Sequence, residues 1–279
     1  MTDPAPDDEG GGRASVDGTA LSGVPETLLW TLRNRAEESA RTDSAYSDPM
    51  AEDLYRRIEH HYGFGKPSQS HPLRALAFDE ITRRFLADHP SGTVVALGEG
   101  LQTSFWRIGD PMVRWLSVDL PEAIALRERL LPAEPNLEHL ACSALDRTWM
   151  DRVDPTGGVL LTAEGLLMYF DPADVRSLLA DCAVRFPGAT LVFDSIPHWF
   201  SRMTLKGLKL SDRYKTPPMP FALSVRQARS LADTIPGVRT AIDLLPARGR
   251  GIWGNRLARS VLPHFPYRPS ITVLEFDGP

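Results

Sequence analysis

The chain has 279 residues, of which 42% are hydrophobic and 24% charged, enough for one large domain or a core domain with an added cap. Its formal net charge is −5, so the chain lacks the excess of basic residues that is typical of a nucleic-acid-binding protein. Its two cysteines cannot by themselves form a disulfide framework or a metal site. No segment approaches the ~18 consecutive apolar residues of a membrane span, and the N-terminus lacks the features of a secretion signal. We therefore expect a soluble, cytoplasmic protein that binds neither nucleic acid nor membranes.

The N-terminal third is predicted to be helical after a disordered tail. Residues 1–20 are rich in Asp, Gly and Pro and have too little apolar surface to offset the entropy lost on ordering. Helices are expected from Pro25, from Pro49 with Asp48 as its N-cap, and from His71 to His89. Because these helices precede the first strand, residues 21–92 are expected to form a cap or an edge layer on a sheet.

The second of these helices carries a pair of histidines. Its buried stripe is predicted to include Ile58 and Tyr62, with His60 and His61 between them. Adjacent side chains on a helix point in different directions, and no cluster of His, Cys or Asp at metal-binding spacing supports the pair. We therefore expect no metal site.

The stretch from Thr93 to Glu122 organises the rest of the chain. Thr93–Leu97 is a short apolar run rich in β-branched residues, which is typical of a strand buried on both faces. Gly98-Glu99-Gly100 follows directly and permits a sharp turn. Arg114–Val118 is the next predicted strand, and Asp119 at its end lies 21 residues after Gly98. An acidic residue about 20 residues past a glycine turn can bind a ribose.

The glycine motif favours a cofactor without a pyrophosphate. Position 103 is Thr, where a dinucleotide-binding motif would have its third glycine. S-adenosylmethionine (SAM) carries a ribose and an adenine but no phosphate, and it is the obvious candidate. For a G-x-G fragment alone, an ordinary turn between a strand and a helix is an equally good interpretation.

The pattern then alternates between strands and helices. Helices are expected from Pro121 and from Pro172, and the further strands are Leu137–Cys142, Gly158–Ala163 and Ala189–Phe193. This alternation predicts a mainly parallel, three-layer α/β fold. Two closing strands are expected at Val238–Leu245 and Ser270–Phe276. Because the segment between them has little room for a crossover helix, one of them is predicted to be antiparallel.

Acidic residues recur at or just past the strand ends, at Asp119, Asp146, Glu164 and Asp194. The carboxyl ends of parallel strands converge at one edge of a sheet, and carboxylates accept hydrogen bonds from ribose hydroxyls, an adenine amino group and an ammonium. Each residue alone could be a helix cap or a surface charge. Their recurrence indicates a binding site.

Residues 198–223 are expected to form a lid over this edge. The segment is long, basic and aromatic, and Trp199, Arg202 and Tyr214 are its candidate acceptor-binding residues. His198 is a weak candidate for a catalytic base and could equally be a surface histidine. Tyr169 is the other weak catalytic candidate and is expected to pack near the cofactor. The sequence contains neither a G-x-S-x-G nucleophile motif nor a phosphate-binding P-loop.

Several motifs together resemble a known family. They are Gly23–Leu28, Asp48–Ala51, Val94–Leu101, Val118–Glu122, Ser143–Asp146 and Ala163–Phe170. In these residues the chain is similar to the leucine carboxyl methyltransferase superfamily, and especially to its bacterial branch of polyketide O-methyltransferases. The similarity spans residues 21 to about 199. It implies a class I SAM-dependent methyltransferase with a Rossmann-like, seven-stranded, mostly parallel sheet and one antiparallel strand.

The resemblance also implies roles for individual residues. Gly98 and Gly100 would pass close to the SAM methionine, and Glu164 would lie near it. Arg74 would pair with the SAM carboxylate, as a guanidinium group can. Asp119 and Leu120 would lie at the ribose, and Leu145 and Asp146 at the adenine.

Three positions depart from the family's usual G-A-G-L-D-T-R motif, at Glu99, Gln102 and Ser104. The sequence leaves open whether Glu99 binds the SAM ammonium or opposes the SAM carboxylate.

The resemblance predicts O-methylation of a carboxyl or hydroxyl group of a small polyketide-like metabolite. A carboxylate is already ionised at pH 7 and needs no base, whereas a phenol with a pKa of about 10 benefits from one. Two alternatives are a protein carboxyl methyltransferase, which would need a broader docking surface, and a SAM-binding scaffold that no longer methylates. The three altered positions motivate the scaffold alternative.

Overall fold

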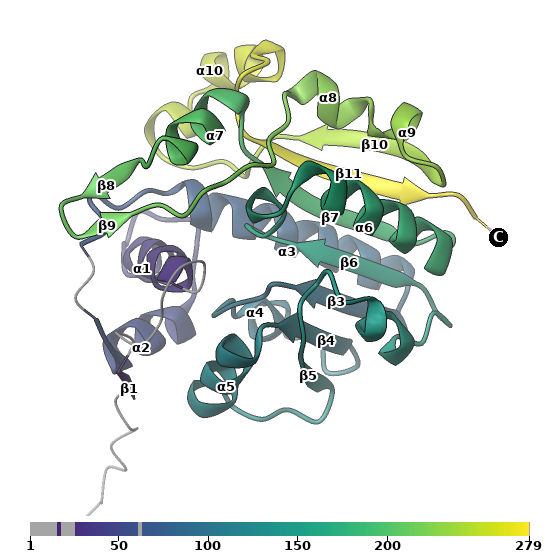
Figure 1. Ribbon diagram of the computed structural model, residues 1–279. Helices are drawn as coiled ribbons and strands as arrows, with labels where there is room; N and C mark the ends of the chain where they lie inside the picture. Colours follow the sequence, from purple (N-terminus) through teal and green to yellow (C-terminus); the bar gives the residue numbers. More distant parts are fainter. Residues whose placement is uncertain (1–15, 18–25, 61–62, 279) are drawn as a thin grey trace, which may run out of the picture.

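A seven-stranded β-sheet forms the centre of the chain, with helices on both of its faces (Figure 1). The computed structural model describes residues 16–17, 26–60 and 63–278. Along the sheet the strands follow the order β10-β11-β7-β6-β3-β4-β5. In chain order they are β3 (Thr93–Leu97), β4 (Arg114–Asp119), β5 (Leu137–Ala141), β6 (Val159–Ala163), β7 (Thr190–Ser195), β10 (Val238–Leu244) and β11 (Ser270–Phe276).

The central strands are buried on both faces, as their apolar runs predict. Val95 and Leu97 of β3 pack into a core cluster with α6 (Pro172–Arg185) and the 3-10 helix η1 (Arg147–Arg152). Val94 and Ala96 alternate with them and pack on the other face against α3 (Ser70–Asp88) and α4 (Ser104–Ile108). This alternation sets the register, because a one-residue slip would exchange the two faces.

Strand β11 runs against both of its neighbours, so the prediction of an antiparallel closing strand is confirmed. It pairs antiparallel with β7 on one side and with β10 on the other. The connection between β10 and β11 is more structured than its sequence suggested. It contains η3 (Gly251–Trp253), α10 (Arg256–Val261) and η4 (Leu262–His264).

The remaining elements follow the predicted alternation closely. Helix α5 (Pro121–Leu130) connects β4 to β5, and η2 (Leu167–Tyr169) follows β6. The predicted lid contains α7 (His198–Leu205) and the hairpin β8 (Lys209–Ser211) and β9 (Tyr214–Lys215). Two short helices, α8 (Val225–Arg229) and α9 (Leu231–Thr234), follow the predicted lid. Ser224 and Gln227 form a capping box at the start of α8.

The N-terminal part departs from its prediction at one junction. Helix α1 (Glu26–Ser39) forms as expected, but α2 (Pro49–Arg57) ends before Ile58, which was predicted to be helical. Ile58 and Glu59 form the short strand β2, which pairs with β1 (Val16–Asp17) inside the predicted tail. His60 therefore follows a strand rather than lying on a helix. Pro25, His61, Tyr62 and the rest of residues 1–20 lie outside the described residues.

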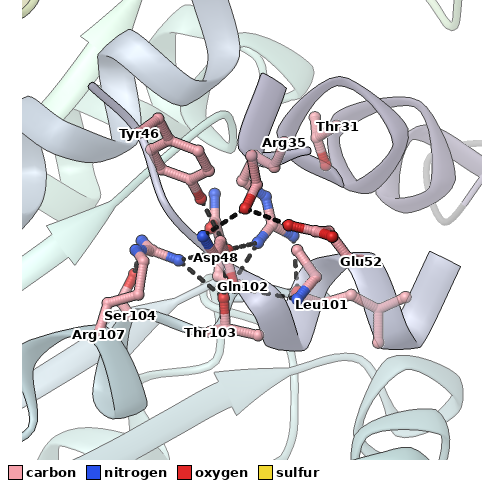
Figure 2. Close-up of polar contacts among 12 residues, drawn as sticks. Thr31, Arg35, Tyr46, Asp48, Glu52, Leu101, Gln102, Thr103, Ser104 and Arg107 are labelled. Atoms are coloured by element: carbon pink, nitrogen blue, oxygen red, sulfur yellow. Dashed lines mark hydrogen bonds and ion pairs between the residues drawn. The ribbon is translucent and has the colours of Figure 1, made fainter. Parts of the chain in front are cut away.

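Asp48 is the centre of a buried polar cluster that joins α1 and α2 to the loop after β3 (Figure 2). Its Oδ1 accepts a hydrogen bond from the Ala51 backbone N–H at 2.9 Å, which caps α2 as predicted. Its Oδ2 lies 3.0 Å from Arg35 Nη1 and 2.9 Å from Arg107 Nη1. The hydroxyl of Thr103 also donates to Oδ2, at 2.7 Å.

The two arginines extend the Asp48 cluster to other elements. Arg35 donates to the backbone carbonyl of Leu101 at 2.7 Å, directly beyond the glycine motif. Arg107 binds Asp79 of α3 through two nitrogens, at 2.8 and 3.0 Å. Burial alone would raise the pKa of Asp48, but the Arg35 and Arg107 guanidinium groups outweigh it and lower this pKa to about 2.

An apolar cluster surrounds this junction. Leu29 and Leu32 of α1 pack with Ala51 and Leu54 of α2 and with Leu101 of the glycine loop.

Among the helices of the described residues, none is long and apolar enough to cross a bilayer.

Replacing Asp48 with Asn should strongly destabilise the fold. Arg35 is fully buried and would lose its counter-charge, and removing one partner of a buried pair typically costs about 3–5 kcal/mol. Urea unfolding should show this loss for Asp48→Asn. The exposed pair Glu80–Arg84 is a matched control, and Glu80→Gln should change stability by at most about 0.5 kcal/mol.

The effect of Asp48 should also depend on pH. Because its folded-state pKa lies below the unfolded value, its contribution is complete above about pH 4 and is lost as the pH falls towards 2. A difference between wild type and Asp48→Asn that stayed constant over this range would contradict the assignment.

Candidate active site

The turn after β3 accepts only glycine at two positions. Gly98 and Gly100 have φ angles of +61° and +54°, which L side chains rarely adopt. A Cβ on Gly98 would lie 2.6 Å from Leu166 Cδ1, and one on Gly100 would lie 2.3 Å from Leu28 Cδ2. The turn is thus closely packed by α1 on one side and by the loop after β6 on the other.

The carboxylate of Asp119 holds this turn from the end of β4. Its Oδ2 accepts from the Gly100 backbone N–H at 2.6 Å, and its Oδ1 accepts from the Leu120 N–H at 2.7 Å. Burial raises the pKa of Asp119, although the two backbone donors oppose the shift. The predicted neighbourhood of Gly98, Gly100, Asp119 and Leu120 is therefore present.

A second cluster lies at the ends of β6 and β7. Arg74 of α3 donates from Nε to Glu164 Oε1 at 2.9 Å and from Nη1 to Asp194 Oδ2 at 2.8 Å. Asp194 also accepts from the Gly165 backbone N–H at 2.5 Å. Burial raises the pKa of Glu164, and the charge of Arg74 opposes that shift. Nη2 of Arg74 has no hydrogen-bond partner among the described residues, so it can bind an additional anionic group.

Each of the three unusual motif residues has a partner in the structure. Glu99 Oε2 forms a buried ion pair with Arg127 Nη2 of α5 at 3.0 Å. Gln102 donates to Glu164 Oε1 at 2.8 Å, and Ser104 accepts from Arg107 Nη2 at 2.9 Å.

Arg127 makes the Glu99 pair part of the glycine loop. Its Nη1 donates to the backbone carbonyls of Gly100 at 2.6 Å and Gln102 at 3.0 Å. The side chains of Glu99 and Arg127 are 3% and 0% exposed. The Glu99 carboxylate is therefore neutralised by the protein itself.

A cavity of about 420 Å³ opens beside these clusters. Its polar end is lined by Arg74, Gly98, Glu164 and Asp194. Its other walls are mainly apolar and come from α1, η2, α7, β8 and the connection between β10 and β11. They include Trp30, Met168, Trp199, Phe200, Leu210, Met219, Trp253 and Leu262.

The cavity brings together some of the predicted site residues and leaves others outside. Arg74, Gly98, Glu99, Glu164, Tyr169 and Trp199 line it. Gly100, Asp119, Leu120, Leu145 and Asp146 do not line it but lie in the loops at the carboxyl ends of β3, β4 and β5. Asp146 accepts from the Thr148 N–H at 3.1 Å and caps η1, which is the alternative that the sequence left open.

Three predicted residues of the lid lie outside the cavity lining. Tyr214 is 2% exposed and packs in the apolar cluster around α1 and α2, with its ring centroid 4.9 Å from that of Phe64. Arg202 is exposed on α7. The Nε2 atom of His198 lies 2.6 Å from Gln227 Oε1. Only Trp199 of the predicted acceptor-binding set reaches the cavity wall.

Several lining residues were not predicted. His71 lies one turn before Arg74 on α3, and this i, i+3 spacing was the available signal for it. Trp253, Leu262 and Arg268 come from a connection that carried no recognisable motif.

Two titratable side chains in the cavity are uncharged at neutral pH. Burial raises the pKa of Tyr169 to about 12, so its hydroxyl stays protonated. Burial, reinforced by the charges of Arg74 and Arg35, lowers the pKa of His71 to about 3. In the part of the chain that the structure describes, no group of three or more His, Cys, Asp or Glu residues is placed to bind a metal.

The reversed strand β11 and the glycine turn held by an acidic residue at the end of β4 define a class I SAM-dependent methyltransferase fold. A family model described as leucine carboxyl methyltransferase matches residues 29–183, more than half of the chain. The chain therefore belongs to the leucine carboxyl methyltransferase family, which confirms the resemblance of its motifs. It is a SAM-dependent O-methyltransferase, and SAM is its cofactor.

One relative agrees with this membership, and one solved structure shares the fold. The tetracenomycin polyketide synthesis O-methyltransferase TcmP of Streptomyces glaucescens is 33% identical over 224 residues, covering 78% of this chain and 82% of that protein. A solved structure described as a possible exported protein from Bordetella parapertussis covers 91% of this chain and 96% of that chain. Its TM-score is 0.50 at 15% identity, so this likeness concerns the fold alone.

Replacing Gly100 with Ala should weaken SAM binding at least roughly tenfold. The new methyl group would clash with the Leu28 side chain that packs on the glycine turn, so Leu28 must move, and a tenfold change corresponds to about 1.4 kcal/mol. Isothermal titration with SAM and S-adenosylhomocysteine measures the effect.

Gly251 is a matched control for this experiment. It has a similar φ of +57°, but a Cβ there would meet nothing within 4 Å. Gly251→Ala should therefore carry the same backbone strain and leave the SAM dissociation constant unchanged. Equal loss of binding in both variants would show that strain alone, and not contact with Leu28, is responsible.

Proposed function

We propose that this enzyme methylates a carboxyl group of a small, polyketide-like metabolite. The observation that carries the proposal is the absence, among the described residues that line the cavity, of an available general base. The pKa of His71, lowered to about 3, makes its imidazole a weak base, and its Nδ1 already faces Asn34, while Tyr169 stays protonated. Glu164 and Asp194 are both paired with Arg74, and Glu99 is paired with Arg127. A carboxylate acceptor needs no base, whereas a hydroxyl acceptor would benefit from one.

The cofactor is proposed to lie along the carboxyl ends of β3 to β6. SAM supplies an electrophilic methyl group on a sulfonium, and the protein's main task is to align it with the acceptor and to exclude water. We assign the SAM carboxylate to the free Nη2 of Arg74 and its ammonium to Glu164. Gly98 lines the cavity, and we assign the methionine chain to that side of the glycine turn.

The ribose and adenine are assigned to the neighbouring strand ends. Asp119 and Leu120 would meet the ribose hydroxyls, and Leu145 and Asp146 the adenine. Glu99 is assigned a supporting role, because its charge is already matched by Arg127.

The acceptor is proposed to occupy the apolar part of the cavity. Its Trp, Phe and Met side chains suit a flat, largely apolar molecule. The similarity to TcmP supports a polyketide-like acceptor and a role in secondary metabolism.

We further propose that residues 21–92 act as a cap and residues 93–279 as the methyltransferase domain, with a lid at 198–223. A cytoplasmic location is consistent with the two free cysteines, Cys142 and Cys182.

The charge of the segments around the cavity favours an anionic acceptor. Residues 198–215 contain five Lys or Arg and one acidic residue, although the whole chain carries −5. Residues 246–269 contain five Arg and no acidic residue, and two of these, Arg250 and Arg268, are paired with Glu38 and Asp243. These segments form α7, the β8–β9 hairpin and the α10 region, which lie at the same end of the molecule (Figure 1). A local positive potential raises the concentration of an anionic substrate at the mouth of a site.

The linkage of the transferred methyl group tests the proposal directly. The enzyme is incubated with methyl-labelled SAM and paired aromatic acceptors that carry either a carboxylic acid or a phenol. We expect the label in a product that releases methanol in mild base, as a methyl ester does. Label confined to base-stable ethers would replace the carboxyl proposal with hydroxyl methylation.

Trp199→Ala should impair the acceptor side alone. Trp199 lines the cavity and its Nε1 donates to the Tyr267 carbonyl at 3.0 Å, so it also ties α7 to the β10–β11 connection. We expect the KM of the acceptor to rise roughly tenfold or more, with the SAM dissociation constant unchanged. Phe265 is a similarly exposed aromatic residue outside the cavity lining, and Phe265→Ala should change neither value. Parallel loss of SAM affinity would place Trp199 at the cofactor instead.

A further inference from the structure

His71 lies in the cavity wall between the acceptor side and the cofactor side. It belongs to the first turn of α3, three residues before Arg74, and its ring packs edge-on against Trp30 at a centroid distance of 4.9 Å. The connection between β10 and β11 packs on the same turn, where the Ala247 N–H donates to the Leu73 carbonyl at 3.2 Å. His71 is thus surrounded by elements that form the acceptor part of the cavity.

The buried side chain of Asn34 determines which nitrogen of His71 carries the proton. The Ser68 backbone N–H donates to Asn34 Oδ1 at 2.9 Å. A backbone N–H can only donate, so the amide oxygen must face Ser68 and the amide NH₂ must face His71. Asn34 Nδ2 lies 2.7 Å from His71 Nδ1, which therefore accepts a hydrogen bond. A neutral His71 must then carry its proton on Nε2.

Nε2 of His71 is the end of the ring left for a ligand. Among the described residues, nothing hydrogen-bonds to it, and the ring forms part of the cavity wall. We propose that Asn34 holds His71 as the Nε2–H tautomer and that this N–H binds one oxygen of the acceptor carboxylate while the other oxygen attacks the methyl group. The O–CH₃ bond forms as the S–CH₃ bond breaks, and the sulfur takes the electron pair and leaves as the neutral thioether S-adenosylhomocysteine. This inference rests on the proposed carboxyl methylation and adds the residue that recognises the carboxylate.

A neutral donor suits this reaction better than a cation. The acceptor carboxylate loses its negative charge as the ester bond forms, so a group that binds that charge strongly stabilises the starting state more than the transition state. Hydrogen bonds from an ionised donor are roughly twice as strong as those from a neutral one. Arg74 of the same helix and Arg35 of α1 both disfavour a charged His71, and Asn34 gives it no counter-charge.

Two variants separate this role from a structural one. His71→Ala removes the donor, whereas Asn34→Asp presents a carboxylate to Nδ1 and should favour a protonated, cationic His71. Ser70→Ala is the control, because Ser70 lines the cavity in the same turn but is not part of the Asn34–His71 pair. The probe is 2-naphthoate, with methyl 2-naphthoate as its uncharged counterpart, in the presence of saturating S-adenosylhomocysteine.

Nitrogen-15 NMR of the full-length enzyme should show His71 protonated at Nε2 and not at Nδ1, and the Nε2 signal should shift when 2-naphthoate is added. His71→Ala should weaken naphthoate binding roughly tenfold and leave SAM binding within twofold. It should weaken methyl 2-naphthoate binding less, because an ester carbonyl is a weaker acceptor than a carboxylate. At acidic pH, Asn34→Asp should add a proton at Nδ1 to the one at Nε2, and the resulting cation should tighten naphthoate binding and lower kcat.

Three results would overturn the inference. They are an Nδ1–H tautomer in the wild type, no naphthoate-induced shift of Nε2, and an equal loss of SAM affinity in His71→Ala. These results are distinguishable from a failure of the proposed function. If the enzyme methylated hydroxyl groups instead, the label would appear in base-stable ethers, and NMR would still show the Nε2–H tautomer of His71.

Discussion

The position of the N-terminal helices depends on one buried carboxylate, Asp48, and on the two arginines that neutralise it. A single buried charge is very costly, so Asp48, Arg35 and Arg107 are stable inside the protein only together. Each of the three comes from a different element, and Arg35 and Arg107 also bind the loop after β3 and α3, respectively. The glycine turn after β3 is therefore held in place partly by helices that lie about 40 to 70 residues earlier in the chain.

The loop after β3 shows how unusual residues are accommodated in a common turn. Glu99 would be unfavourable beside an anionic group if its charge were free, but Arg127 matches it and also binds two carbonyls of the loop. Gln102 and Ser104 each have a side-chain partner as well. The departures that motivated a non-catalytic interpretation are thus interactions that hold the turn in shape, in keeping with an enzyme.

The cofactor side and the acceptor side are built in different ways. The cofactor side consists of turns that directly follow consecutive parallel strands, and its residues are positioned by the sheet. The acceptor side is assembled from α1, the start of α3, the lid and the β10–β11 connection, which are far apart in sequence. The few polar groups on that side, such as His71, are oriented by neighbours from other segments rather than by their own element.

This difference explains what could be predicted from the sequence. Apolar runs and glycine turns located the sheet, its reversed strand and the neighbourhood of Gly98 and Asp119, because these depend on local patterns. The end of α2 was missed because Ile58 is apolar at helical spacing but pairs with β1 instead. Trp253 carries no local signal of its position, since it reaches the cavity only through the path of a connection without a motif.

The same contrast holds for side-chain direction. The sequence indicated that Tyr214 belongs to an aromatic lid segment, but not that it would turn towards Phe64 and Trp30. Likewise, the departures at Glu99, Gln102 and Ser104 could be read from the sequence, whereas their partners on α5, in the loop after β6 and on α4 could not.

The pairing of Glu99 with Arg127 has an evolutionary consequence. Exchanging Glu99 for the alanine that is usual in the family would leave Arg127 buried without a counter-charge. Exchanging Arg127 first would leave the Glu99 carboxylate buried without a counter-charge. Neither single step is easily tolerated, so the two positions are expected to change together among descendants of this lineage. An acid at position 99 should consequently mark a subgroup of the family that also carries a basic residue at position 127.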